Sequence, residues 1–114
     1  MTGYAAVDAT TLEGPVDRVH LQRQTLGDSG LEREILSLFR RQSASVFARL
    51  SDARQQNERR DLAHTLKGSA RAIGAWRVAA AAEAVEAAGP DADLGPLEGA
   101  LAEADAAIIH ILAA

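Results

Sequence analysis

The sequence predicts an all-α protein: an up-down four-helix bundle with one short additional helix at its N-terminal side. Alanine is abundant and β-branched residues are sparse, a composition that favours helices. Apolar residues recur at helical spacing in several long segments, and no segment alternates as a half-buried strand would. Short polar, Gly- or Pro-containing stretches separate these segments, and short connections make neighbouring helices antiparallel. Together these observations indicate a bundle.

Length and composition restrict the class of protein. The chain has 114 residues, the size of one domain, and no cysteine that could form a disulfide or a thiolate metal site. A net charge of −4 and the scarcity of aromatic residues argue against a nucleic-acid partner. The first residues lack the pattern of a signal peptide, and no apolar run could span a bilayer. We therefore expect a cytoplasmic protein that binds no membrane.

The chain divides into an arm and a bundle. Residues 1–14 show no sustained periodicity, and we expect a flexible arm there, followed by the helical bundle over residues 15–114. Asp17 is a candidate N-cap, so a short helix is predicted to begin just after it. This helix should run to Leu26, because Gly27 then stops it.

The second predicted helix covers about residues 29–53 and is long and amphipathic. Asp28 or Ser29 can cap its start. A stripe with one polar member repeats at helical spacing along it and is expected to face the core. The stripe consists of Leu31, Ile35, Leu38, Phe39, Gln42, Val46 and Leu50.

Three further helices complete the prediction. The third covers about residues 57–73 and ends at Gly74. The fourth runs through an Ala-rich stretch at about residues 75–88, and a Gly-Pro pair ends it. The last covers about residues 96–112, and its apolar face consists of Leu97, Leu101, Ala104, Ile108 and Ile111.

His64 is predicted to lie on the solvent face of the third helix. On a helical wheel with about 100° per residue, Leu62, Leu66 and Ile73 form one apolar stripe within about 20° of the point opposite the histidine. If the helix buries this stripe, the imidazole must face solvent.

The neighbours of His64 suggest a chemical use. Arg60, Lys67 and Arg71 place three cations on the exposed face, where they could stabilise a phosphoryl group on the ring. A neutral imidazole is a good nucleophile near neutral pH. Gly68 lies one turn after His64, and a glycine in a helix costs about 1 kcal/mol relative to alanine. This cost suggests that the space beside the ring is needed by another protein's active site.

The histidine segment resembles the signature of histidine-containing phosphotransfer (HPt) domains. The resemblance rests on His-Thr-Leu-Lys-Gly-Ser-Ala at residues 64–70 and Ile-Gly at residues 73–74. The Leu-Phe pair at residues 38–39 and the Ala-rich segment 74–86, ending in Val-Glu, are also similar to the family. The resemblance covers roughly residues 17–112, and only its histidine segment is specific.

The resemblance implies a function. His64 would accept a phosphoryl group from a receiver-domain aspartate and pass it to another receiver, with Lys67 assisting and Gly68 leaving room for the partner. The partners would be the receiver domains of a hybrid histidine kinase and of a response regulator, and Mg²⁺ is expected in the partner receiver. No ATP-binding motif is present, so we expect a monomeric phosphoryl carrier without kinase activity of its own. Arg60 and Arg71 could contact the phosphoryl group or the partner, or simply form a solvated face.

Other interpretations remain open. The main alternative is a non-catalytic helical protein-interaction bundle in which His64 is incidental. A histidine-kinase dimerisation domain fits less well, because Thr65 follows the histidine where an acidic residue is usual. No metal site is expected: Asp61 and His64 have a ligand-like spacing, but the histidine faces outward. We take His20 as an ordinary surface or boundary residue and Trp76 as a packing residue.

Overall fold

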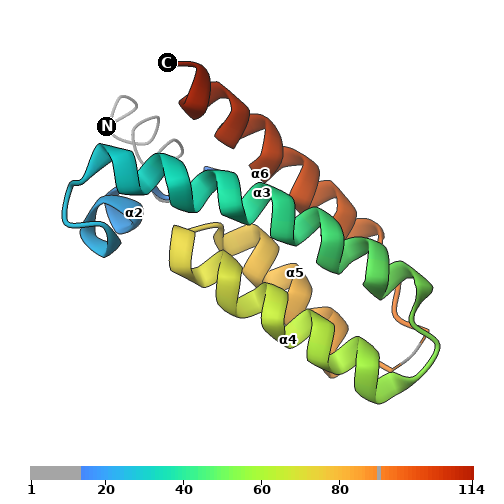
Figure 1. Ribbon diagram of the computed structural model, residues 1–114. Coiled ribbons are helices and arrows are strands. Elements are labelled where there is room, and N and C mark those ends of the chain that lie inside the picture. The colour runs from blue at the N-terminus through green and yellow to red at the C-terminus, as the bar shows by residue number, and fades with distance from the viewer. Residues whose placement is uncertain (1–13, 90) are drawn as a thin grey trace, which may run out of the picture.

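The computed structural model describes residues 14–89 and 91–114, and the arm expected over residues 1–14 therefore lies almost wholly outside the described residues. Within the described ranges the chain forms five helices and no strand, which confirms the all-α prediction (Figure 1). The helices are α2 (Arg18–Gln24), α3 (Ser29–Asp52), α4 (Gln56–Ile73), α5 (Trp76–Ala87) and α6 (Gly95–Ala113).

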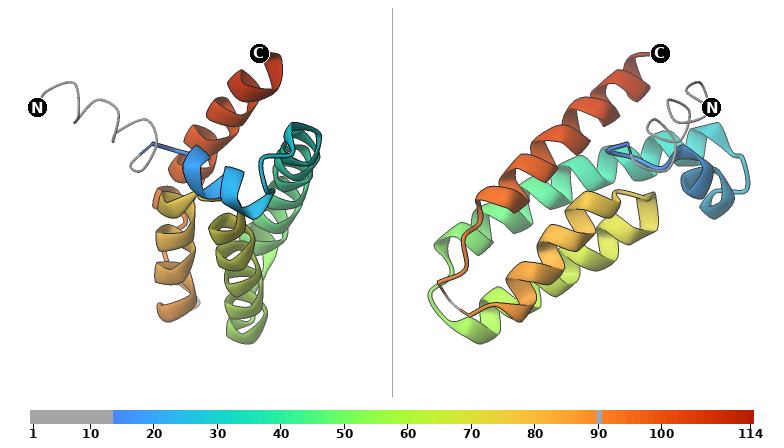
Figure 2. Two further views of the ribbon diagram at one scale, coloured as in Figure 1. Left: turned by 90° about the vertical axis from the view of Figure 1, so that its left-hand side faces the viewer. Right: turned by 180° about the vertical axis from the view of Figure 1, so that it is seen from behind.

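The four long helices form the predicted up-down bundle. Each runs antiparallel to the next, and α6 returns to pack on both α5 and α3, which closes the ring (Figure 2). Helix α2 lies across the end of the bundle where α4 turns into α5. Of all helix pairs, α4 and α5 are the most extensively packed. This pairing determines the surroundings of the central histidine.

The helix ends agree closely with the predicted caps. The Asp17 carboxylate accepts a first-turn backbone N–H of α2 at 3.1 Å, and the Asp28 carboxylate does the same for α3 at 3.0 Å. The cap of α3 is therefore Asp28 and not the serine after it. Helix α2 ends at Gln24, two residues earlier than predicted, because Leu26 already has a left-handed φ of 54°. Gly27 follows with a φ of 78° and turns the chain into α3.

The buried face of α3 differs from the predicted stripe. Leu31 and Leu38 are 40% and 43% exposed, whereas Leu36, which the stripe left out, is fully buried. The prediction was wrong for these residues because α3 packs against both α4 and α6. A helix between two neighbours buries the face that points into the wedge between them, and the periodicity of one helix does not identify that direction.

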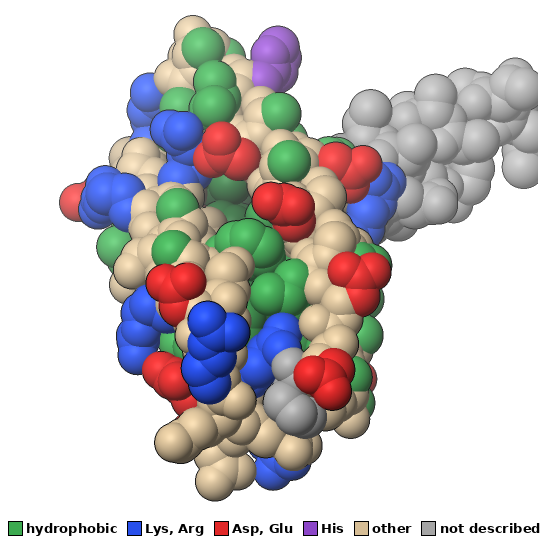
Figure 3. Space-filling model, turned by 90° about the vertical axis from the view of Figure 1, so that its right-hand side faces the viewer, with side chains coloured by type: hydrophobic (Ala, Val, Ile, Leu, Met, Phe, Trp, Pro, Cys, Tyr) green, Lys and Arg blue, Asp and Glu red, His purple; other side chains and the backbone are tan. Residues whose placement is uncertain are grey.

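Apolar side chains from all five helices fill the core. At the end of the bundle where α3 leads into α4, they line a hollow between the helices, and charged side chains surround its rim (Figure 3). The Ala-rich α5 contributes small side chains to the core. Small residues at an interface let two helices approach closely, which explains the extensive packing of α5 on α4. The buried residues of α5 are Val78, Ala79, Ala82 and Val85.

The turn between α4 and α5 is tied to the start of α2. Gly74 ends α4 with a φ of 80°, and a Cβ on it would lie 2.8 Å from the backbone oxygen of Asp17. The Trp76 indole donates to the Asp17 carboxylate at 3.0 Å. His20 Nε2 donates to the carbonyl of Arg71 at 2.9 Å, and its ring lies 4.8 Å from that of Trp76. His20 is half-buried, as expected of a residue at the boundary of the bundle, and its hydrogen bond holds α2 against α4.

Candidate functional site

His64 lies at the middle of α4 and is open to solvent. Its side chain is 67% exposed, while Leu62, Leu66 and Ile73 on the opposite face of the helix are buried. The orientation predicted from the helical wheel is therefore confirmed. The apolar stripe binds α4 to the core and leaves the imidazole outside.

A carboxylate from α5 contacts both His64 and Lys67. His64 Nδ1 lies 2.8 Å from Oε2 of Glu86, and the Lys67 ammonium donates to Oε1 of the same carboxylate at 2.7 Å. The hydrogen bond from Lys67, and then the one from His64, hold the pKa of Glu86 below its ordinary value of 4.5. Glu86 is therefore ionised at neutral pH and bridges the two side chains.

The contact with Glu86 selects the tautomer of His64. An ionised carboxylate can only accept hydrogen bonds, so Nδ1 of His64 must carry a proton. In the neutral ring, Nε2 then holds the lone pair. The free lone pair of the neutral His64 ring is thus on Nε2, and the ring is held at its other nitrogen by Glu86.

Lys67 is less accessible than the sequence suggested. We expected it on the exposed face with the other cations, but its side chain is only 15% exposed. It lies on the side of α4 that faces α5, where the ammonium is engaged by Glu86. The expectation of an exposed lysine was wrong because a wheel centred on His64 cannot tell which flank of α4 a neighbouring helix covers. The assistance of Lys67 in transfer stays a prediction.

The remaining site residues differ in their surroundings. Gly68 is exposed, and a Cβ built on it would meet no atom within 4 Å. Nothing within the described part of the chain therefore requires a glycine there. The Arg71 guanidinium donates to Glu83 of α5 at 3.1 Å. Arg60 is exposed, and no hydrogen bond or ion pair to any described residue engages its side chain.

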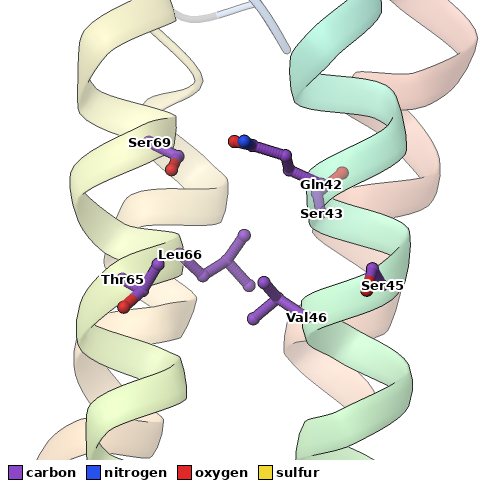
Figure 4. Close-up of a pocket in the computed structure, with 7 residues that line it drawn as sticks. All are labelled: Gln42, Ser43, Ser45, Val46, Thr65, Leu66 and Ser69. Carbon is purple, nitrogen blue, oxygen red and sulfur yellow. The ribbon is translucent and has the colours of Figure 1, made fainter.

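A groove between α3 and α4 borders the histidine face. Leu66 and Val46 point toward each other across it, and Ser69 faces Gln42 about one turn away (Figure 4). Thr65, next to His64 in sequence, belongs to its wall. The cavity has a volume of about 230 Å³ and is lined by Gln42, Ser43, Ser45, Val46, Thr65, Leu66 and Ser69.

The comparison with protein families is consistent with this geometry. The sequence model described as the Hpt domain matches residues 34–114, which include all of α4, α5 and α6. The chain belongs to the Hpt domain family. Hpt domains are phosphocarrier modules that take part in histidine phosphotransfer in phosphorelays and interact with receiver domains of two-component systems. A search of curated proteins and a search of solved structures gave no match.

The Hpt match begins within α3, so the short helix α2 lies before it. None of the described helices is both long enough and apolar enough to cross a membrane. Across the described residues, no group of three or more His, Cys, Asp or Glu side chains is arranged to hold a metal ion.

Glu86, which contacts both His64 and Lys67, was not among the site residues predicted from the sequence. Glu86 is the last residue of the segment 74–86 that resembles the HPt family, and the resemblance assigned it no role. A usable signal was present: Glu83 and Glu86 are three residues apart on one side of α5, as Lys67 and Arg71 are four apart on α4. Antiparallel packing of the two helices would have predicted the two ion pairs.

Proposed function

We propose that this chain carries a phosphoryl group on Nε2 of His64 between the receiver domains of a two-component phosphorelay. It accepts the group from an aspartate of one receiver and passes it to an aspartate of another, acting as a monomeric carrier with no kinase activity of its own. The donor and acceptor are the receivers of a hybrid histidine kinase and of a response regulator. The observation that carries this proposal is the exposed His64 with its Nδ1 proton held by Glu86, in a chain of the Hpt family.

The tautomer of His64, with its proton on Nδ1, determines that Nε2 is the atom that takes part in the transfer. The lone pair of Nε2 attacks the phosphorus of the aspartyl phosphate, a P–N bond forms, and the P–O bond breaks as the electron pair leaves with the aspartate carboxylate. The ring becomes positively charged, and Glu86 beside Nδ1 stabilises that charge, as the carboxylate of a catalytic triad does for its histidine. Attack by the next receiver's aspartate reverses these steps. Such transfers use Mg²⁺, which we expect the receiver's carboxylates to hold.

Two neighbours support the step. Lys67 has three donor hydrogens, so its ammonium can keep the bond to Glu86 and still offer another to a phosphoryl oxygen one turn away. Gly68 has open space at its Cβ position, and this space lets the surface of a receiver approach the ring.

The central test replaces the nucleophile. We expect His64→Gln to abolish uptake of radiolabelled phosphate from a phosphorylated receiver, while the circular dichroism spectrum stays that of the parent, because the side chain is exposed. The label on the parent should be acid-labile and base-stable, as a phosphoramidate is. Label retained by the variant would refute the assignment. Acid-stable label on the parent would instead indicate a hydroxyl such as that of Thr65 or Ser69.

A parent protein that binds receivers without taking up phosphate would support the alternative of a non-catalytic interaction bundle. Sedimentation of the parent with and without a receiver separates these outcomes from a failure to bind, and it also tests the proposed monomer.

A further inference from the structure

We infer that Arg60 is the docking cation of this site: it pairs with the anionic phosphoaspartate pocket of the receiver, whereas the other two cations of the histidine face are already engaged by α5. This inference rests on the proposed function and assigns one of its partner contacts to a single residue.

Two ion pairs join α4 to α5 beside the histidine face. Arg71 pairs with Glu83 at 3.1 Å, and Lys67 pairs with Glu86 at 2.7 Å. From Arg71 back to Lys67 the chain of α4 moves about one turn, and the partner on antiparallel α5 moves about one turn forward, from Glu83 to Glu86. Arg60 lies two turns before Lys67 on α4, but α5 ends one residue after Glu86. The helix that neutralises the other two cations therefore offers no further carboxylate at this position.

Arg60 is also in reach of the reaction. It precedes His64 by four residues, so the two Cβ atoms are about 5–6 Å apart on one face of α4. On the wheel, Arg60 lies about 40° to one side of His64 and Gly68 about 40° to the other. The arginine thus borders the open approach to the ring on the side opposite the glycine. A guanidinium presents a planar fork that matches phosphate and carboxylate oxygens.

Asp61 is the carboxylate next to Arg60 in the sequence. It is exposed and adjacent in sequence, but consecutive helical residues project about 100° apart and do not face each other. The pair therefore gives the histidine face a polarity, with the cation on the α5 flank and the anion on the α3 flank. An anionic pocket of the receiver docks favourably over Arg60, on the α5 flank, and unfavourably over Asp61, on the α3 flank.

The experiment compares Arg60→Ala with two matched variants. Arg77→Ala removes the same charge from the far side of α5, where Arg77 pairs with Glu103, and Asp61→Ala removes the opposite charge next to Arg60. Phosphoryl transfer from a phosphorylated receiver is measured over a range of receiver concentrations and at two ionic strengths. Phosphorylation by phosphoramidate, a small donor without a protein pocket, is measured in parallel.

We expect Arg60→Ala to raise the KM for the receiver about tenfold with little change in kcat, because an exposed docking pair acts mainly on association. The ratio of the KM of Arg60→Ala to the KM of the parent should shrink at high salt, because salt screens the interaction between Arg60 and the receiver. Arg77→Ala should behave as the parent, and phosphorylation of Arg60→Ala by phosphoramidate should be unchanged.

Several outcomes would overturn the inference. An unchanged KM would show that Arg60 does not touch the receiver. Equal losses with phosphoramidate and with the receiver would place Arg60 in the chemistry at His64 instead of docking. If Arg77→Ala raised the KM for the receiver as much as Arg60→Ala does, only the net charge of the protein would matter. The same would follow if Asp61→Ala lowered that KM by as much as Arg60→Ala raises it. Absence of transfer in the parent itself would instead refute the proposed function.

Discussion

Replacing Gly68 should stabilise the fold and impair transfer at the same time. The residue lies in the interior of α4, its side-chain position is open, and a Cβ would meet no atom within 4 Å. An alanine there gains the difference in helix propensity, about 1 kcal/mol, with no steric cost to subtract. For a domain of this size that gain raises the melting temperature by about 4 °C.

The same space is the route by which we propose that a receiver reaches His64. Gly68→Gln keeps a smaller part of the propensity gain, about 0.5 kcal/mol, and adds a long side chain one turn from the ring. We expect transfer from a phosphorylated receiver to fall at least tenfold, while phosphorylation by a small donor is much less affected. The assays are thermal unfolding followed by circular dichroism and a time course of phosphoryl transfer.

Gly99 provides a matched control for this prediction. It also lies inside a helix, α6, and a Cβ on it would likewise meet no atom within 4 Å. Gly99→Ala should raise the melting temperature about as much as Gly68→Ala and leave transfer unchanged. Transfer by Gly68→Gln at the parental rate would refute the argument for a steric gap. A fall in melting temperature for Gly68→Ala would refute the reasoning about propensity.

Two further predictions concern the carboxylate bridge. Lys67→Ala should slow transfer by roughly one to two decades, as the loss of a charge-assisted hydrogen bond implies, and should lower the melting temperature because the side chain is only 15% exposed. Lys67→Met retains the packing of the stem, so it should recover stability but not transfer; recovery of both would show that the charge is not used. Since the pKa of Glu86 is lowered in the fold, its ionised form adds stability that is present at neutral pH and is lost as the pH falls through that pKa, below 4.5. The difference in unfolding free energy between the parent and Glu86→Gln, measured with urea, should therefore vanish on acidification, and a difference that grew would contradict the bridge.

Much of the fold is encoded locally, which is why the sequence predicted it well. Helix starts depend on a capping side chain and the three residues after it, as at Asp17 and Asp28. Helix ends depend on a few residues, as at Gly74 with its left-handed backbone. The exposure of His64 follows from the apolar stripe of its own helix, so the central feature of the site needed no tertiary information.

The sequence by itself therefore determined the helices, their order and the outward position of His64. Only the tertiary structure decided that Glu86, 22 residues further along the chain, meets the ring, and that Lys67 is covered while Arg60 is not. It also decided which side of α3 is buried. The physical reason is common to these cases: a helix repeats its faces from its own sequence, but which flank a neighbour covers, and in which register, depends on how side chains from separate helices pack together.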